Sequence, residues 1–151
     1  MKLNLGSGAH PLDGFENLDL TNGWRFEDGL GQYPDGSVEG ITVSHALMYV
    51  PLADWPFVFA EIARVLEPGG VVRVTEDATD DPRSSRYPDG FDGVVTLTSR
   101  GLVRTYLELA GLDAVDVTPN WSYYRNGASG ELIQTFHGTP PKVFHIEGVK
   151  P

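Results

Sequence analysis

The chain has 151 residues, of which 40% are hydrophobic, and its formal net charge is -10. This length and composition suit one globular domain over residues 1–151 with a substantial core. The absence of cysteine excludes disulfides, thiolate metal sites, cysteine nucleophiles and iron-sulfur clusters. The acidic charge argues against a nucleic-acid partner, because a polyanion would meet net repulsion.

The N-terminus, Met1-Lys2-Leu3-Asn4, lacks the basic and long apolar regions of a signal peptide. No run approaches the ~20 apolar residues of a membrane span. We therefore expect a cytoplasmic protein that has no membrane segment.

The start of the chain carries the strongest local pattern. Residues 2–5 are predicted to form a strand that leads into Gly6-Ser7-Gly8, and a second predicted strand, residues 15–20, ends at Asp19 and Leu20. Only a loop joins the two strands, so the first crossover helix is reduced. Glycine lets the backbone approach a ligand closely, and Asp19 can accept two hydrogen bonds from a ribose diol. The order predicts a nucleoside-binding sheet.

Strands and helices alternate along most of the remaining chain. Trp55, Phe59 and Ile62 recur at helical spacing, and Asp54 and Thr98 are candidate caps for two helices. The predicted strands are 24–26, 40–44, 71–75, 113–118, 131–136 and 142–149, and the predicted helices are 54–66 and 98–109. We expect an α/β fold: a Rossmann-like, mostly parallel sheet with helices on both faces and an antiparallel C-terminal hairpin. The irregular residues 78–93 form a loop long enough to act as a lid or binding loop.

The spacing after the glycines distinguishes between nucleotide ligands. A dinucleotide fingerprint has G-x-G-x-x-G/A opening a helix, with its acidic residue about 20 residues later. Here Ala9-His10-Pro11 follows Gly8 and Asp19 comes much sooner, which leaves little room for a helix that would bind a pyrophosphate. A ligand that has a ribose and no phosphate fits better, and S-adenosylmethionine is such a ligand.

Four segments together carry a family resemblance. In order they are Lys2-Leu3-Asn4-Leu5-Gly6-Ser7-Gly8, Asn17-Leu18-Asp19-Leu20, Asp35-Gly36-Ser37-Val38-Glu39 and Arg64-Val65-Leu66-Glu67-Pro68-Gly69-Gly70. They resemble the hallmark segments of the class I S-adenosylmethionine-dependent methyltransferases, most closely the short branch that begins at the first strand. The resemblance covers residues 1–77 well and residues 98–118 loosely.

The resemblance implies S-adenosylmethionine as the cofactor and a set of residues that hold it. The methionine portion would lie over the glycine segment, the ribose on Asp19 beside Leu20, and the adenine against Asp28 and Gly29. A simple Asp-Gly turn is the alternative interpretation of residues 28–29. The implied cofactor-binding residues are Gly6, Ser7, Gly8, Asp19, Leu20, Asp28, Gly29 and Ser44.

Two groups of residues at predicted strand ends are candidates for catalysis. His45 follows Ser44 on the active-site face of the resembling family, and a neutral imidazole near pH 7 can act as a general base. Alternatively, His45 only hydrogen-bonds the backbone or lines the cofactor pocket. Glu76 and Asp77 could position a substrate or hold a metal, but one carboxylate pair without clustered ligands is weak evidence for a metal site. We predict no metal.

The leading functional prediction is methyl transfer from S-adenosylmethionine to an oxygen or nitrogen nucleophile of a small-molecule, sugar or protein acceptor. Positioning of donor and acceptor can supply much of the rate. The alternatives are a non-catalytic or partner-dependent S-adenosylmethionine-binding module and an enzyme that degrades S-adenosylmethionine without an acceptor. The acceptor and the oligomeric state are left open by the sequence.

Overall fold

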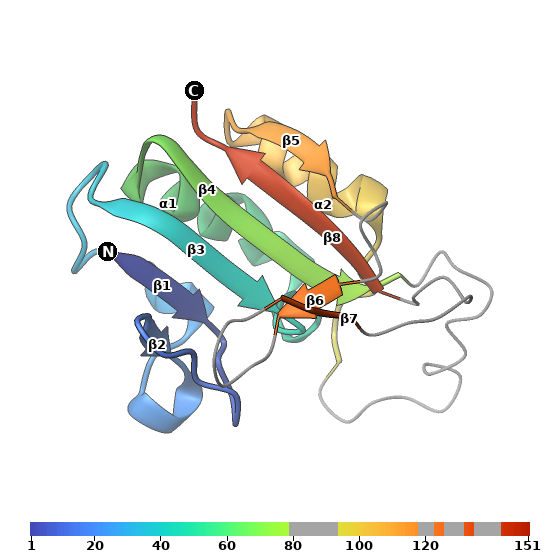
Figure 1. Cartoon of the computed structure of the whole chain (residues 1–151), viewed down its shortest axis with the longest axis horizontal. Helices are drawn as coiled ribbons and strands as arrows, with labels where there is room; N and C mark the ends of the chain where they lie inside the picture. The colour runs from blue at the N-terminus through green and yellow to red at the C-terminus, as the bar shows by residue number, and fades with distance from the viewer. Residues whose placement is uncertain (79–93, 118–122, 126–131, 135–142) are drawn as a thin grey trace.

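A six-stranded mixed sheet forms the centre of the computed structural model, which describes residues 1–78, 94–117, 123–125, 132–134 and 143–151 (Figure 1). The strand order is β2-β1-β3-β4-β8-β5. Strands β1 to β4 pair in parallel, whereas β8 is antiparallel to both of its neighbours, β4 and β5. The bounds are β1 Lys2–Leu5, β2 Glu16–Leu18, β3 Val38–Ser44, β4 Leu66–Asp77, β5 Asp113–Asp116 and β8 Val143–Val149. A separate pair joins β6 (Tyr123–Arg125) to β7 (Leu132–Gln134).

Both α-helices lie on the same face of this sheet. Figure 1 shows α1 (Trp55–Val65) and α2 (Arg100–Leu109) behind the strands. Tyr106 of α2 packs against Trp55 and Phe59 of α1, with ring centroids 5.4 and 5.9 Å apart. We expected helices on both faces, but in the described part of the chain the two α-helices form one layer. None of the described helices is long and apolar enough to cross a bilayer.

Short 3-10 segments complete the connections on the N-terminal side of the molecule. They are η1 Leu20–Asn22, η2 Phe26–Asp28, η3 Leu47–Tyr49 and η4 Leu52–Asp54. The expected strand over residues 24–26 is wrong. The Asp28 carboxylate accepts a hydrogen bond from the Arg25 N–H, and the Trp24 indole N–H donates to the Gly29 carbonyl, so side-chain contacts fold this segment back on itself.

The sheet separates a hydrophobic face from a polar one because successive residues of a strand point to opposite sides. Leu3, Ile41 and Val72 lie in register on neighbouring strands, and all three are buried in the core. Residues of the other face alternate with them and include Arg73 and Glu147, which form an ion pair across β4 and β8. The helices cover the hydrophobic face, which is where burial stabilises the fold.

The C-terminal strand has other partners than the sequence predicts. The antiparallel orientation of β8 is confirmed, but β8 inserts between β4 and β5, and β7 pairs with β6. Among the predicted caps, the Asp54 side chain makes no cap hydrogen bond, and Ser99 caps α2 by accepting from the Leu102 N–H. The neighbouring Thr98 hydroxyl instead donates to the Asp77 carbonyl. Residues 79–93, the predicted loop, lie outside the described residues.

Asparagine side chains support the crossover between β1 and β2, in which no helix forms among residues 6–15, as predicted. The Asn17 Oδ1 accepts hydrogen bonds from the Leu12 N–H and from the Asn4 amide, both at 2.8 Å. The Asn17 amide in turn donates to the carbonyls of Leu12 and Phe15. These contacts replace the main-chain hydrogen bonds that a crossover helix would make.

Candidate functional site

The carboxyl end of β1 turns sharply at the glycine segment. Gly6 and Gly8 have φ angles of +70° and +51°, values that glycine adopts without strain. A Cβ on Gly6 would lie 2.5 Å from the Ala46 Cβ, whereas a Cβ on Gly8 would meet nothing within 4 Å. Gly6 therefore packs directly against the residue that follows His45, and Gly8 borders open space.

Asp19 joins the end of β2 to this glycine segment. Its Oδ2 accepts a hydrogen bond from the Gly8 N–H at 3.0 Å, and its Oδ1 accepts one from the Thr21 N–H at 3.1 Å. Burial acts to raise the pKa of Asp19, but these main-chain hydrogen bonds outweigh it and the pKa lies below its usual value. The site thus holds an ionised carboxylate beside the glycine segment at neutral pH.

The four remaining predicted cofactor-binding residues lie at three positions. Leu20 follows Asp19 and is 63% exposed, and Ser44 is exposed at the end of β3. Asp28 and Gly29 end η2, where a Cβ on Gly29 would lie 2.8 Å from the Phe57 ring of α1. The Asp28 carboxylate accepts a hydrogen bond from the Arg25 N–H within this segment. In the part of the chain that the structure describes, none of these four residues hydrogen-bonds to Gly6, Ser7 or Gly8.

Strand β4 holds the segment that carries His45. The His45 N–H donates to the Thr75 carbonyl at 2.8 Å, and the next two N–H groups, of Ala46 and Leu47, donate to Oε1 of Glu76 at 2.9 and 2.7 Å. Glu76 is fully buried, and burial raises its pKa to about 8. The His45 Nδ1 lies 3.8 Å from Oδ2 of Asp77. The structure therefore brings together the two groups of catalytic candidates.

A second histidine lies beside this cluster on the polar face of the sheet. The His145 Nδ1 is 2.9 Å from the Thr75 hydroxyl, and its ring is buried. Burial is the main cause that lowers the pKa of His145, with smaller contributions from Arg73 and His45. The His145 ring is therefore neutral at pH 7.

Comparisons with known proteins bear on the fold. Residues 24–74 match the family model of the methyltransferase domain, and a search of curated proteins finds no match. An S-adenosylmethionine-dependent methyltransferase from Archaeoglobus fulgidus aligns with a TM-score of 0.70 at 10% identity, over 99% of this chain and 85% of that chain. A possible histamine N-methyltransferase from Thermotoga maritima aligns with a TM-score of 0.66 at 12% identity, over 99% and 82%.

A third solved structure is a complex between the Haloferax volcanii Trm112 methyltransferase activator and a proposed methyltransferase, with a TM-score of 0.65 at 18% identity, over 99% of this chain and 82% of that chain. At these identities, structural similarity establishes the fold alone, and the family match is confined to residues 24–74. The chain therefore has the fold of the S-adenosylmethionine-dependent methyltransferases.

The residues of this chain fit S-adenosylmethionine, on which two of these neighbours depend, in two respects. The N–H groups of Gly8 and Thr21 hold the Asp19 carboxylate in place, and the side chain is only half-buried, so a ribose diol can reach it. The open space beside Gly8 leaves room for a ligand at the end of β1. In the described part of the chain, no group of three or more histidine, aspartate or glutamate side chains could hold a metal ion.

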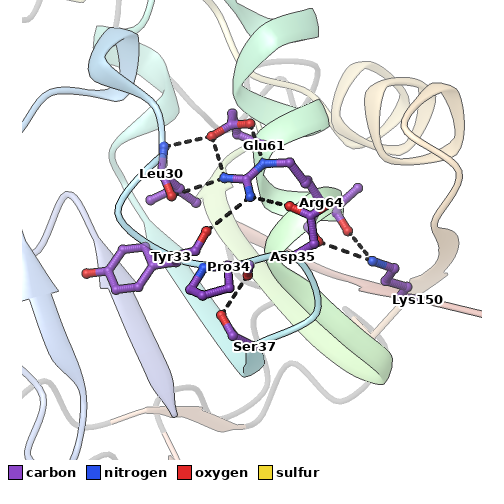
Figure 2. A network of polar contacts seen from close by, with 9 residues as sticks. Leu30, Tyr33, Pro34, Asp35, Ser37, Glu61, Arg64 and Lys150 are labelled. Atoms are coloured by element: carbon purple, nitrogen blue, oxygen red, sulfur yellow. Dashed lines mark hydrogen bonds and ion pairs between the residues drawn. The ribbon is translucent and has the colours of Figure 1, made fainter.

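The chain also contains a polar network with no role assigned from the sequence. Figure 2 shows the Arg64 guanidinium between Glu61 and the loop of residues 30–35. All five of its N–H groups have acceptors: both carboxylate oxygens of Glu61, the Asp35 carboxylate, and the carbonyls of Leu30 and Tyr33. Glu61 also accepts from the Leu30 N–H at 2.9 Å. The network fastens the loop that follows Asp28 and Gly29 to α1.

Sequence reasoning missed Arg64 and Ala46 as contributors to the site, and it named Glu76 only as a possible substrate or metal contact. Arg64 was recognised as part of a family segment, but its acceptors lie in another segment of the chain. Ala46 limits the space at Gly6, and Glu76 anchors the loop after β3. A buried glutamate directly after a run of β-branched residues was the available signal for the last of these, because buried carboxylates need hydrogen-bond donors.

Proposed function

We propose that this enzyme binds S-adenosylmethionine at the carboxyl ends of β1 and β2 and methylates an oxygen or nitrogen nucleophile of a small-molecule, sugar or protein acceptor. The observation that carries the proposal is the hydrogen bond between the Asp19 carboxylate and the Gly8 N–H, at 3.0 Å. It joins a glycine turn to an ionised acidic residue at adjacent strand ends. Ligands of open α/β sheets bind beyond the carboxyl ends of the strands.

The proposed cofactor-binding surface has an inner part, formed by the glycine segment and Asp19, and an outer part, formed by Asp28, Gly29 and Ser44. Gly6, Ser7 and Gly8 would lie under the methionine portion, and Asp19 would accept hydrogen bonds from the ribose. Leu20 supports an apolar contact beside the ribose, since a leucine that is 63% exposed offers uncovered surface there. Asp28, Gly29 and Ser44 remain proposed contacts of the outer part.

The bound cofactor would supply a methyl group already activated by a sulfonium. The chain's own residues then have to align the acceptor and accept its proton. His45 is the proposed general base, because its ring is 43% exposed at the end of β3 and its neighbour Ala46 contacts Gly6. The formal charge of -10 favours an uncharged or cationic small molecule, a sugar or a protein over a polyanion as the acceptor. The cytoplasmic localisation and the single domain stay predictions.

Substitution of Asp19 tests the cofactor site. Asp19→Ala should weaken S-adenosylmethionine binding by about 10-fold or more, because a hydrogen bond to a charged acceptor contributes ~1.5 to 3 kcal/mol. Titration calorimetry measures the affinity. Asp19→Asn is the matched control for folding, since an amide oxygen can still accept from a main-chain N–H. Unchanged affinity in a folded Asp19→Ala protein would contradict the placement of the ribose.

The two glycines of the turn should respond differently to alanine. Gly8→Ala should weaken cofactor binding by about 5-fold or more while costing only the ~1 to 2 kcal/mol of a positive φ angle, because its Cβ would enter the open space. Gly14, with a φ angle of +79° and likewise nothing within 4 Å, provides the control for that conformational cost. Equal affinities of Gly8→Ala and Gly14→Ala would show that no ligand lies over Gly8.

A labelled-methyl transfer assay tests the acceptor class. Candidate small molecules, sugars and protein extracts would be incubated with the enzyme and cofactor carrying an isotopic methyl group. Label in a small-molecule or protein fraction, lost in His45→Gln, supports both the transfer and the role of His45. Release of labelled cofactor fragments without any acceptor would instead favour the degrading enzyme.

A further inference from the structure

His45 has an unusual backbone conformation for its residue type. Its φ angle is +51°, and in the described part of the chain no other residue except glycine has a positive φ. Such a conformation costs about 1 to 3 kcal/mol and persists only where the surrounding structure holds it. Local strain of this kind is concentrated at functional sites, so the contacts that hold His45 are informative.

The last three residues of β4 hold His45 from two sides. The Thr75 carbonyl accepts the His45 N–H, and Glu76, on the helix side of the sheet, accepts the N–H groups of Ala46 and Leu47. Side chains alternate along a strand, so Asp77 points to the opposite face from Glu76. There its Oδ2 lies 3.8 Å from the His45 Nδ1. At the end of β4, the Glu76 carboxylate thus holds the backbone that follows His45, and the Asp77 carboxylate faces the His45 ring.

Exposure differs sharply between the two partners of this pair. The side chain of Asp77 is 6% exposed, and that of His45 is 43% exposed. A carboxylate held in the structure can orient a more accessible imidazole, as in catalytic dyads where one ring nitrogen is fixed and the other is free to react. In free enzymes such contacts are often longer than a hydrogen bond and tighten when the ligand binds.

We propose that Asp77 is a positioning residue that accepts the Nδ1–H of His45 and leaves Nε2 as the basic nitrogen toward the acceptor. This inference rests on the proposed role of His45 as general base. In the transfer, an electron pair of the acceptor forms the bond to the methyl carbon, and the electrons of the carbon–sulfur bond remain on sulfur. The proton of the acceptor passes to Nε2, and the imidazolium that results faces the Asp77 carboxylate.

Other charged and titratable groups lie on the strands near the pair of His45 and Asp77. His145 of β8 interacts electrostatically with His45, and Arg73 and Asp116 act on His145 in turn. Glu76 lies on the other face of β4, and Arg73 is paired with Glu147. All of these groups are retained when Asp77 alone is replaced. A comparison of the wild-type protein with an Asp77 variant therefore isolates the effect of Asp77.

Nuclear magnetic resonance of histidine-labelled protein tests the proposal. In Asp77→Asn the midpoint of the His45 titration should fall by about 1 pH unit, because an opposite charge nearby favours the protonated ring. Asp116→Asn is the matched control: it should move the titration of His145 and leave that of His45 in place. An unchanged His45 midpoint in folded Asp77→Asn protein would overturn the proposal.

The wild-type protein provides an independent measurement. Its neutral His45 ring should carry the proton on Nδ1, which nitrogen chemical shifts report directly, and a proton on Nε2 would overturn the proposal even if Asp77→Asn failed to fold. Neither measurement needs cofactor or acceptor. Failure of the cofactor site would appear as lost S-adenosylmethionine binding, so the two failures are distinguishable. With an acceptor in hand, Asp77→Asn should lower kcat and move the acidic limb of its pH profile, leaving cofactor affinity unchanged.

Discussion

Replacing Glu76 with alanine should lower the free energy of unfolding by about 3 to 5 kcal/mol, because two buried N–H groups lose their acceptor at ~1 to 3 kcal/mol each and a cavity remains. The acceptor is Oε1, which receives the N–H groups of Ala46 and Leu47. Among the described residues, these two N–H groups have no acceptor other than Glu76. Urea unfolding at constant pH measures the loss.

The effect of Glu76 should also depend on pH. Burial raises the pKa of Glu76 to about 8 from its ordinary 4.5, so the folded state favours the protonated carboxyl. The stabilisation is fully present below about pH 4.5 and is lost as the pH rises through about 8. The difference between wild type and Glu76→Ala should therefore be largest below about pH 4.5 and should shrink as the pH rises toward about 8. Glu76→Gln keeps the acceptor without the titration, and equal slopes for Gln and wild type would contradict this account.

Replacing Arg64 with methionine should lower the free energy of unfolding by about 2 to 4 kcal/mol, since hydrogen bonds to charged groups contribute ~1.5 to 3 kcal/mol and several are lost together. The carbonyls of Leu30 and Tyr33 lose their donors, and Glu61 loses the guanidinium that lowers its pKa. Arg64→Lys should recover only part of this, because an ammonium cannot reach five acceptors in one plane.

An exposed arginine provides the control for that loss. Arg104 lies on the outer side of α2, and Arg104→Met should change stability by less than about 0.5 kcal/mol. Thermal and urea unfolding of the two variants under the same conditions give the comparison. If Arg64→Met were as stable as Arg104→Met, the network in Figure 2 would not fasten the loop to α1.

Elements with a clear hydrophobic period could be predicted from the sequence. β1 has the predicted bounds Lys2–Leu5, and α1, Trp55–Val65, follows from the apolar spacing of its buried stripe. Local patterns do not reveal which strands pair, because pairing is decided by burial across the whole sheet. The alternating residues 142–149 indicate a strand but not its place between β4 and β5.

Some site residues could likewise be predicted from local sequence patterns, whereas the contacts between distant segments could not. Gly6, Gly8 and Asp19 could be proposed from their order, since each sits at a strand end that the pattern defines. The contact between His45 and Asp77 depends on the register of β3 against β4, in which Ser44 lies opposite Thr75. The anchoring of residues 46–47 by Glu76 depends on the same register. Contacts of this kind become visible only when the sheet is assembled.

The most direct test of the central claim is calorimetric titration of the wild-type protein with S-adenosylmethionine and S-adenosylhomocysteine, with NAD as the control ligand. The account predicts that both adenosyl ligands bind with micromolar affinity and that NAD does not bind, because the turn after Gly8 leaves little room for a pyrophosphate. Absence of binding by both adenosyl ligands, or binding of NAD in their place, would contradict it.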